Sequence, residues 1–111
     1  MGSVRRGDLV TISMQGDFGK PRPALVIQSD VFNATHATVT ILPITSDVID
    51  AVIFRLTIEP SEANGLRKTS QIMVDKTMTV KVEKIGSVFG RLDDSCMVSV
   101  NRALAVFVGL A

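Results

Sequence analysis

The 111-residue sequence has little of the chemistry on which many enzymes depend: one cysteine, one histidine, and no tyrosine or tryptophan. Cys96 alone cannot form an internal disulfide, and the four Cys/His ligands of a structural zinc site are lacking. A Ser-His-Asp or Cys-His arrangement would depend on His36, which we expect in an exposed loop. There is no glycine-rich phosphate loop of the Walker or dinucleotide type. The sequence therefore predicts no metal site, no catalytic triad and no cofactor.

Long hydrophobic runs are also lacking. The longest, at 103–110, falls far below the roughly 18 residues that a membrane-spanning helix needs. Residues 1–8 contain no signal-peptide core, so we expect a cytoplasmic protein that does not enter a membrane. Hydrophobic residues make up 46% of the chain and charged residues 21%, which excludes a disordered chain. At this length, residues 1–111 are expected to form a single domain.

The net charge of +1 predicts no polyanionic partner by itself, but the charges are unevenly distributed. Basic residues dominate segments 1–22 and 67–91, whereas the segment between them, 30–62, is mostly acidic. If the fold brings the two basic segments together, they could form an anion-binding face. The alternative is an ordinary solvated surface.

Alternation of apolar and polar residues with a period of two dominates the first two-thirds of the chain and is typical of half-buried strands. The run PALVIQ at 23–28 is almost continuously apolar, which indicates a central strand. Residues 29–34 can form a capped helical turn, and 60–65 a turn. The predicted strands cover 8–14, 23–28, 38–43, 53–59, 70–75, 79–82 and 87–91.

The pattern becomes helical after Leu92. Asp93 or Asp94 can accept the free amides of the first turn, and Gly109 ends the segment. An apolar stripe then recurs at helical spacing, through Met97, Val100, Leu104 and Val108. The expected fold is therefore mainly β: a small, strongly bent antiparallel barrel with a C-terminal α-helix. Its edge strands invite pairing with a second copy.

The five phenylalanines are dispersed, and most of them are expected in the core, which argues against an aromatic platform for stacking bases. Phe18 is the exception, because it lies in the polar, glycine-flanked loop 15–20. It can either stack on a base or cover the open end of the barrel. Cys96 is expected to be an inert core thiol.

Three local features could carry chemistry. Pro21 and Pro23 fix the backbone around Arg22, so its guanidinium could bind a phosphate or pair with a nearby carboxylate. The hydroxyls of Thr45 and Ser46, at a strand end, could bind an anion or form a local turn with Asp47. Asp75, beside Lys76, could be a base with a tuned pKa or a strand-end turn residue.

Taken in order, four landmarks resemble one family. RGD at 6–8 opens the first strand, 22–28 reads RPALVIQ, 42–46 reads LPITS, and GLRKTSQ at 65–71 leads into VDKT at 74–77. The sequence resembles the MazF/PemK (Kid) family of toxins from bacterial toxin–antitoxin pairs. The resemblance runs from about residue 4 through the predicted C-terminal helix.

The resemblance implies an SH3-like barrel of the type shared with the gyrase poison CcdB, ending in a helix. It also implies an endoribonuclease, an mRNA interferase, that cleaves single-stranded RNA at short sequences without a metal ion. The ribose 2′-hydroxyl would attack the adjacent phosphorus and leave a 2′,3′-cyclic phosphate and a 5′-hydroxyl. Such toxins form homodimers, and a disordered tail of the cognate antitoxin blocks the RNA groove.

By position, the resemblance assigns Arg22 to stabilising the phosphate, Thr45 to bonding it and aligning the 2′-hydroxyl, and Asp75 to the general base of some members. Those members have an arginine two positions before the carboxylate, where this chain has Met73, so the acid–base pair is incomplete. Lys76 could compensate, although neighbouring strand residues point to opposite faces. The further residues assigned to RNA binding are Phe18, Lys20, Ser46, Ser70, Gln71 and Lys76.

Two other functions stay open. A CcdB-like DNA gyrase poison would share the fold, but its gyrase contact depends on a tryptophan-containing C-terminal end, and this chain ends in FVGLA. A catalytically eroded barrel that only binds nucleic acid or peptide is the third possibility, and Met73 is the residue in its favour.

Overall fold

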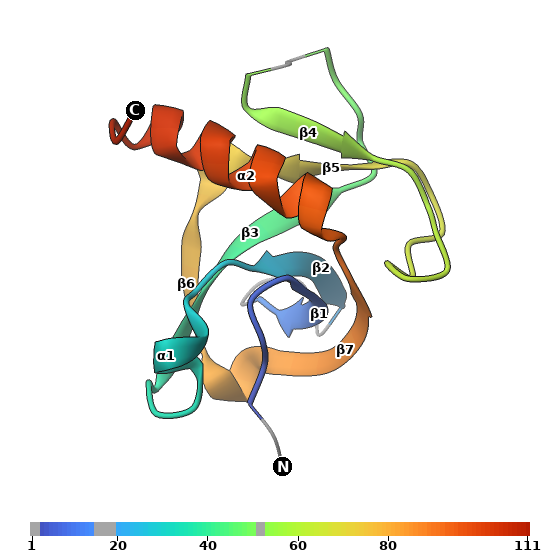
Figure 1. Ribbon diagram of the computed structural model, residues 1–111. Coiled ribbons are helices and arrows are strands. Elements are labelled where there is room, and N and C mark those ends of the chain that lie inside the picture. Colours follow the sequence, from blue (N-terminus) through green and yellow to red (C-terminus); the bar gives the residue numbers. More distant parts are fainter. Residues whose placement is uncertain (1–2, 15–19, 51–52) are drawn as a thin grey trace.

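Seven antiparallel strands and a C-terminal helix make up most of the computed structural model, which describes residues 3–14, 20–50 and 53–111 (Figure 1). The strands are β1 (Asp8–Ser13), β2 (Pro21–Val26), β3 (Thr38–Thr45), β4 (Arg55–Ile58), β5 (Ser70–Met73), β6 (Met78–Lys81) and β7 (Ile85–Arg91). The helices are α1 (Asp30–Asn33), α2 (Asp94–Phe107) and the 3₁₀ turns η1 (Val74–Lys76) and η2 (Val82–Lys84). The predicted mainly β fold with a C-terminal helix is confirmed.

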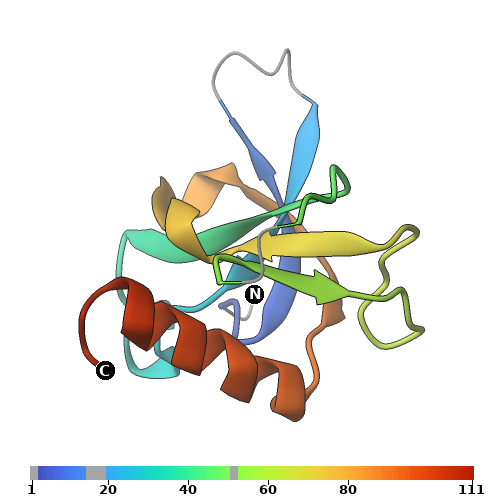
Figure 2. The ribbon, with the colours of Figure 1, turned by 90° about the horizontal axis from the view of Figure 1, so that it is seen from above.

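The long strand β3 organises the sheet, whose order is β4-β5-β3-β2-β1-β7. Along one edge β3 pairs with β2; along the other it pairs first with β6 and then, at Ile44 and Thr45, with β5. The pairing of β1 with β7 shifts register twice, between Leu9 and Val10 and between Val10 and Ile12. Such irregularities bend a sheet, and here they help it to curl. Figure 2 shows the end of β1 and the start of β2 side by side, extending from the body of the sheet.

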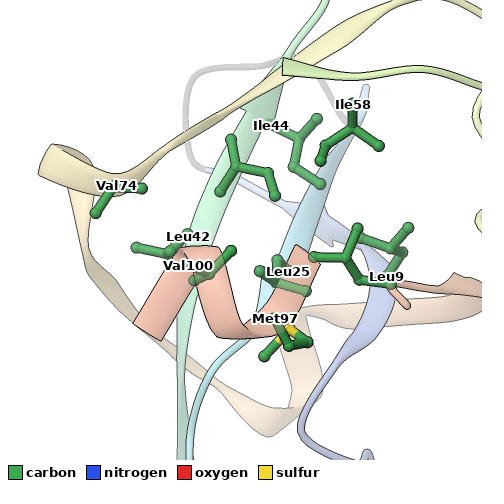
Figure 3. Packing of buried hydrophobic residues seen from close by; sticks show 10 residues of the cluster. Leu9, Leu25, Leu42, Ile44, Ile58, Val74, Met97 and Val100 are labelled. Atoms are coloured by element: carbon green, nitrogen blue, oxygen red, sulfur yellow. The ribbon is translucent and has the colours of Figure 1, made fainter. Parts of the chain in front are cut away.

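The two faces of the central strands bury different cores. On the inner face, a barrel core contains Val10, Ile12, Ala24, Val26, Val39 and Ile41. On the outer face, Leu9, Leu25, Leu42 and Ile44 pack with Met97 and Val100 of α2 (Figure 3). Because β2 is covered on both faces, it needs no polar side, which explains the nearly continuous apolar run.

Helix α2 begins where the capping pattern predicts. Asp93 is the N-cap, and its Oδ1 accepts the backbone N–H of Cys96 at 2.7 Å. Met97 and Val100 are buried, whereas Val108 is exposed and lies just beyond the end of the helix at Phe107, before Gly109 with its φ of +84°. None of the helices in the described part of the chain has the length and apolarity to cross a membrane.

The Asp93 cap predicts a pH-dependent contribution to stability. The hydrogen bonds from Cys96 and Ser95 lower the pKa of the Asp93 carboxyl below its usual 3.8. A lowered folded-state pKa stabilises the fold above the unfolded-state value, and the effect is lost as pH falls through the folded-state value. We expect Asp93→Ala to lower the melting temperature by a few degrees at pH 7. The difference from wild type should shrink below pH 3.8 in thermal unfolding; a constant difference at all pH values would contradict this.

Two sequence expectations are wrong. Phe32, Phe54 and Phe107 are exposed and not core residues, because aliphatic side chains fill the interior. Phe54 and Phe107 instead pack edge to face on the surface, with ring centroids 5.6 Å apart. The strand expected over 70–75 ends at Met73, because the 3₁₀ turn η1 follows it. This turn separates β5, which pairs with the end of β3, from β6, which pairs with the start of β3.

Candidate active site

A cavity of about 620 Å³ opens where the inner face of the sheet emerges at the end of the barrel. Its walls come from the facing ends of β1 and β2, the end of β3, and the segment running through β5, η1 and β6. The polar and charged residues that line it are Lys20, Arg22, Thr45, Ser46, Ser70 and Lys76. Six of the nine residues assigned to the site from the sequence therefore lie around one opening.

Strand register brings Arg22 and Thr45 to the same place. The β2–β3 ladder ends where Ala24 pairs with Pro43, and Arg22 and Thr45 each lie two residues beyond that pair. A step of two residues preserves the face of a strand, so both side chains continue the inner face of the barrel. Arg22 is exposed and Thr45 half-buried, which leaves both accessible from the opening.

The Thr45 hydroxyl makes the local turn anticipated from the sequence and keeps a donor for a ligand. Its Oγ1 accepts the backbone N–H of Asp47 at 3.0 Å. A hydroxyl has one proton and two lone pairs, so accepting this bond leaves the O–H group able to donate. The turn therefore orients the hydroxyl without consuming the hydrogen atom that a phosphate oxygen would accept.

The electrostatics of the opening favour an anion. Lys20, Arg22 and Lys76 are exposed around it, and among the described residues that line it there is no carboxylate. Lys20 and Arg22 come from the first basic segment of the sequence and Lys76 from the second. The fold thus brings members of the two segments together, which was the condition for an anion-binding face.

Asp75 lies beside the cavity and not in its wall. It sits in η1, where its Oδ2 is 3.6 Å from the Lys76 ammonium. Its Oδ1 is buried and has no hydrogen-bond partner among the described residues. The two side chains therefore meet each other, contrary to the expectation that they point to opposite faces of a strand. The physical reason is that residues 74–76 form a 3₁₀ turn.

Gln71 has a structural role, because its side chain is buried and hydrogen-bonded within the protein. Its side chain is 3% exposed and does not line the cavity. Its amide accepts the N–H of Ile49 at 3.1 Å and donates to the carbonyl of Ile49 and to Thr57 Oγ1 at 2.9 and 3.2 Å. Gln71 also pairs with Thr45 in the β3–β5 register. It therefore anchors the segment that follows Thr45, and the expectation that it contacts RNA has no support in this arrangement.

Two residues assigned to RNA binding from the sequence, Ser70 and Phe18, remain to be placed. Ser70 lines the cavity, and its hydroxyl donates to the carbonyl of Lys68 at 2.9 Å. Phe18 lies outside the described residues. The apolar part of the lining, notably Met14 and Met78, was missed, although the alternation of Val10, Ile12 and Met14 already placed Met14 on the inner face.

The other reactive side chains lie elsewhere. His36 is exposed after α1, as expected. Cys96 is half-buried, and burial raises the pKa of its thiol, which suits an unreactive cysteine. In the described part of the chain, no three His, Cys, Asp or Glu side chains are grouped so that they could share a metal ion.

Comparisons with known proteins identify the family to which the chain belongs. Residues 5–108 match the family of PemK-like, MazF-like toxins of type II toxin–antitoxin systems. The chain is 46% identical over 109 residues to a probable endoribonuclease MazF of Mycolicibacterium smegmatis, with 97% of this chain and 99% of the relative covered. It is 30% identical over 111 residues to the endoribonuclease MazF of Staphylococcus epidermidis, with 96% and 92% covered.

A solved structure shares the fold. It is described as an endoribonuclease in complex with its cognate antitoxin from mycobacterial species, and it superposes with a TM-score of 0.83 at 20% identity over 98% of each chain. The family match covers nearly the whole sequence. This chain belongs to the PemK/MazF-like family of toxins from type II toxin–antitoxin systems.

Proposed function

We propose that this protein is an endoribonuclease that cleaves single-stranded RNA at short sequences in the cytoplasm, without a metal ion, as the toxin of a toxin–antitoxin pair. The observation that carries the proposal is the meeting of Arg22 and Thr45 at one cation-lined opening. Two sequence relatives, one named a probable endoribonuclease and the other an endoribonuclease, support the reaction class.

The proposed reaction uses a nucleophile that RNA itself carries. The 2′-oxygen forms a bond to the adjacent phosphorus while the bond from phosphorus to the 5′-oxygen breaks. The 2′-hydroxyl loses its proton, and the departing 5′-oxygen gains one. The products are a 2′,3′-cyclic phosphate and a 5′-hydroxyl. The protein has to align the attack and stabilise the negative charge that accumulates on the phosphoryl oxygens.

Arg22 and Thr45 suit these two tasks. A guanidinium donates two parallel N–H groups, a geometry that matches a pair of phosphoryl oxygens. The Thr45 hydroxyl, oriented by the Asp47 N–H, can donate to the same phosphate. Lys20 adds positive charge at the rim of the opening, where the flanking phosphates of a single strand would run, and Lys76 lines the same opening while paired with Asp75.

The proposal that cleavage needs no metal ion rests on the kinds of side chain that line the cavity. No carboxylate or imidazole lines the cavity among the described residues, and lysine and arginine do not bind divalent cations. Charge stabilisation by a fixed guanidinium takes the place that a metal ion would fill in other nucleases.

Asp75 is proposed as a lesser contributor. Its carboxylate faces Lys76 and has no arginine beside it at position 73. We expect Asp75→Asn to lower the rate of RNA cleavage by roughly tenfold, well below the effect of removing Arg22. Single-turnover cleavage of a defined transcript measures the difference. A complete loss of activity in a folded Asp75→Asn protein would make Asp75 the principal base.

The proposed assembly is a homodimer that an antitoxin inhibits. Support comes from exposed apolar side chains near the start of β4 and at the end of α2, among which Phe54 and Phe107 pack against each other; the set is Ile53, Phe54, Val106, Phe107 and Val108. Apolar surface of this kind is typical of an interface. The structural neighbour solved with its cognate antitoxin supports the second partner.

We expect Phe107→Glu to weaken dimerisation by roughly 30-fold or more, because a charge would enter an apolar contact. Sedimentation velocity at micromolar concentration measures the assembly. Phe32→Glu places the same charge on an exposed phenylalanine of α1 and should leave the dimer intact. A monomeric wild-type protein, or a Phe107→Glu variant that stays dimeric, would contradict the proposed interface.

Incubation of the purified protein with a long single-stranded RNA in EDTA tests the function. The proposal predicts discrete fragments with 5′-hydroxyl ends that polynucleotide kinase can label directly. Intact RNA with tight binding would indicate a binding module, and intact RNA with stalled DNA gyrase would indicate a gyrase poison. Either result would overturn the proposal.

A further inference from the structure

The lining of the cavity combines two chemically different sets of side chains. One set is polar and includes Arg22, Thr45, Lys20 and Lys76. The other set is apolar and includes three of the five methionines of the chain, Met14, Met73 and Met78. These three side chains are called the methionine floor below. A site for an inorganic anion alone would not need such a surface, because apolar groups give an anion no compensation for its lost hydration.

Strand register makes the methionine floor continuous with the barrel interior. Met78 pairs with Ile41, whose side chain belongs to the barrel core. Because Ile44 pairs with Ile72, the preceding Pro43 and the following Met73 lie opposite each other on the other face. That face also carries Thr45, so the floor and the phosphate-binding groups share one concave surface.

Met73 differs from the other two members of the floor. Met14 and Met78 pack against the barrel core, so part of their surface already has a structural use. Met73 is half-buried and lines the cavity, yet among the described residues it is not one of the side chains packed against either core. Its thioether is therefore apolar surface presented to whatever occupies the cavity.

We propose that the methionine floor, with Met73 as its principal member, binds the nucleobase next to the cleaved bond. This inference rests on the proposed ribonuclease function and adds a substrate contact to it. A nucleotide combines an anion with a flat aromatic face, as the cavity combines cations and hydroxyls with an apolar floor. Sulfur makes favourable contacts with aromatic rings, and no aromatic side chain lines the cavity among the described residues.

The floor reads the face of a base and not its edge. Thioethers are weak hydrogen-bond acceptors and cannot donate, so they distinguish poorly between the edges of the four bases. Methionine is also unbranched and adapts to ligands of different size. Cleavage should therefore require a base at the nucleotide that contacts the floor, but the cleavage rate should differ little between purines and pyrimidines at that position.

A kinetic cycle between substrate and protein tests the inference. An oligonucleotide that wild-type protein cleaves at one site is compared with versions carrying an abasic ribonucleotide on either side of the cleaved bond, which keep the 2′-hydroxyl and the phosphate. For wild type, one of the two replacements should lower kcat/KM about tenfold. For Met73→Ala, kcat/KM for the intact oligonucleotide should fall by a similar factor. The abasic replacement should then lower kcat/KM for this variant by less than about twofold more.

Control variants separate base binding from folding. Met73→Leu keeps an apolar side chain of similar volume and should restore the dependence on the base. Met97→Leu changes a methionine that is buried under α2, outside the cavity, and should keep the full dependence on the base. The inference would be overturned if the abasic replacement lowered kcat/KM of a folded Met73→Ala protein as much as it lowers that of wild type. It would also be overturned if neither abasic replacement changed kcat/KM of wild-type protein. Failure of wild type to cleave the intact oligonucleotide would instead overturn the ribonuclease proposal itself, and this inference with it.

Discussion

Replacement of Arg22 by alanine is expected to slow RNA cleavage by roughly a hundredfold or more, with no loss of folded structure. The guanidinium is exposed at the rim of the cavity, so its removal leaves no void in either core. In the proposed mechanism the change removes a pair of donors for the charge that develops on the phosphoryl oxygens, and one such donor typically contributes about that factor to the rate. Single-turnover cleavage of a defined transcript measures the effect.

Two companion variants sharpen this result. Arg22→Lys keeps the charge but lacks the planar pair of N–H groups, so its rate should fall between those of wild type and Arg22→Ala. Arg67→Ala removes an exposed arginine that does not line the cavity, and it should cleave at nearly the wild-type rate. If Arg22→Ala cleaves RNA as fast as Arg67→Ala, Arg22 has no part in the mechanism.

Replacement of Thr45 by valine is the second change with a large expected effect, again about a hundredfold in the rate. Valine has nearly the shape of threonine, but it cannot accept the Asp47 N–H or donate to a phosphate oxygen. The loss should appear in kcat more than in KM, because the hydrogen bond is expected to strengthen as charge accumulates in the transition state.

Thr45→Ser supplies the test of that explanation. Serine keeps the hydroxyl and the turn, so most of the activity that valine removes should return. Thr79→Val makes the same shape-conserving change at an exposed position of β6 that does not line the cavity, and it should leave the rate unchanged. Equal activity of Thr45→Val and wild type would exclude the hydroxyl from the reaction.

Local patterns were enough to predict most elements of the fold. The alternation at 8–14 and the stripe through Met97 and Val100 record which face of each element is buried, so the period alone identifies strand and helix. Element ends were less predictable. Strand β3 runs to Thr45, two residues beyond the expected end, because Ile44 and Thr45 pair with β5. That partner is distant in sequence, and no local pattern reports it.

For the candidate site too, the sequence predicts individual residues, whereas their spatial arrangement comes from the structure. Residue type, neighbouring residues and the family resemblance single out Arg22 and Thr45 individually, but their meeting depends on the β2–β3 register, which only the structure supplies. Gln71 looked equally suitable as a polar strand residue, and only its contacts with Ile49 and Thr57 reveal its structural task. From the sequence, Met73 is only the absence of the family's arginine, whereas the structure places its side chain in the apolar lining of the cavity.

A crystal structure of the protein with a single-stranded RNA whose 2′-hydroxyl at the cleavage site is replaced by hydrogen would show whether Arg22 and Thr45 bind the scissile phosphate. That change removes the nucleophile and preserves the phosphate. We expect the uncleaved phosphate to lie between the Arg22 guanidinium and the Thr45 hydroxyl, with its oxygens about 2.7–2.9 Å from the guanidinium nitrogens. A phosphate at the cleavage site that contacts neither side chain, or an RNA bound away from the cavity, would contradict it.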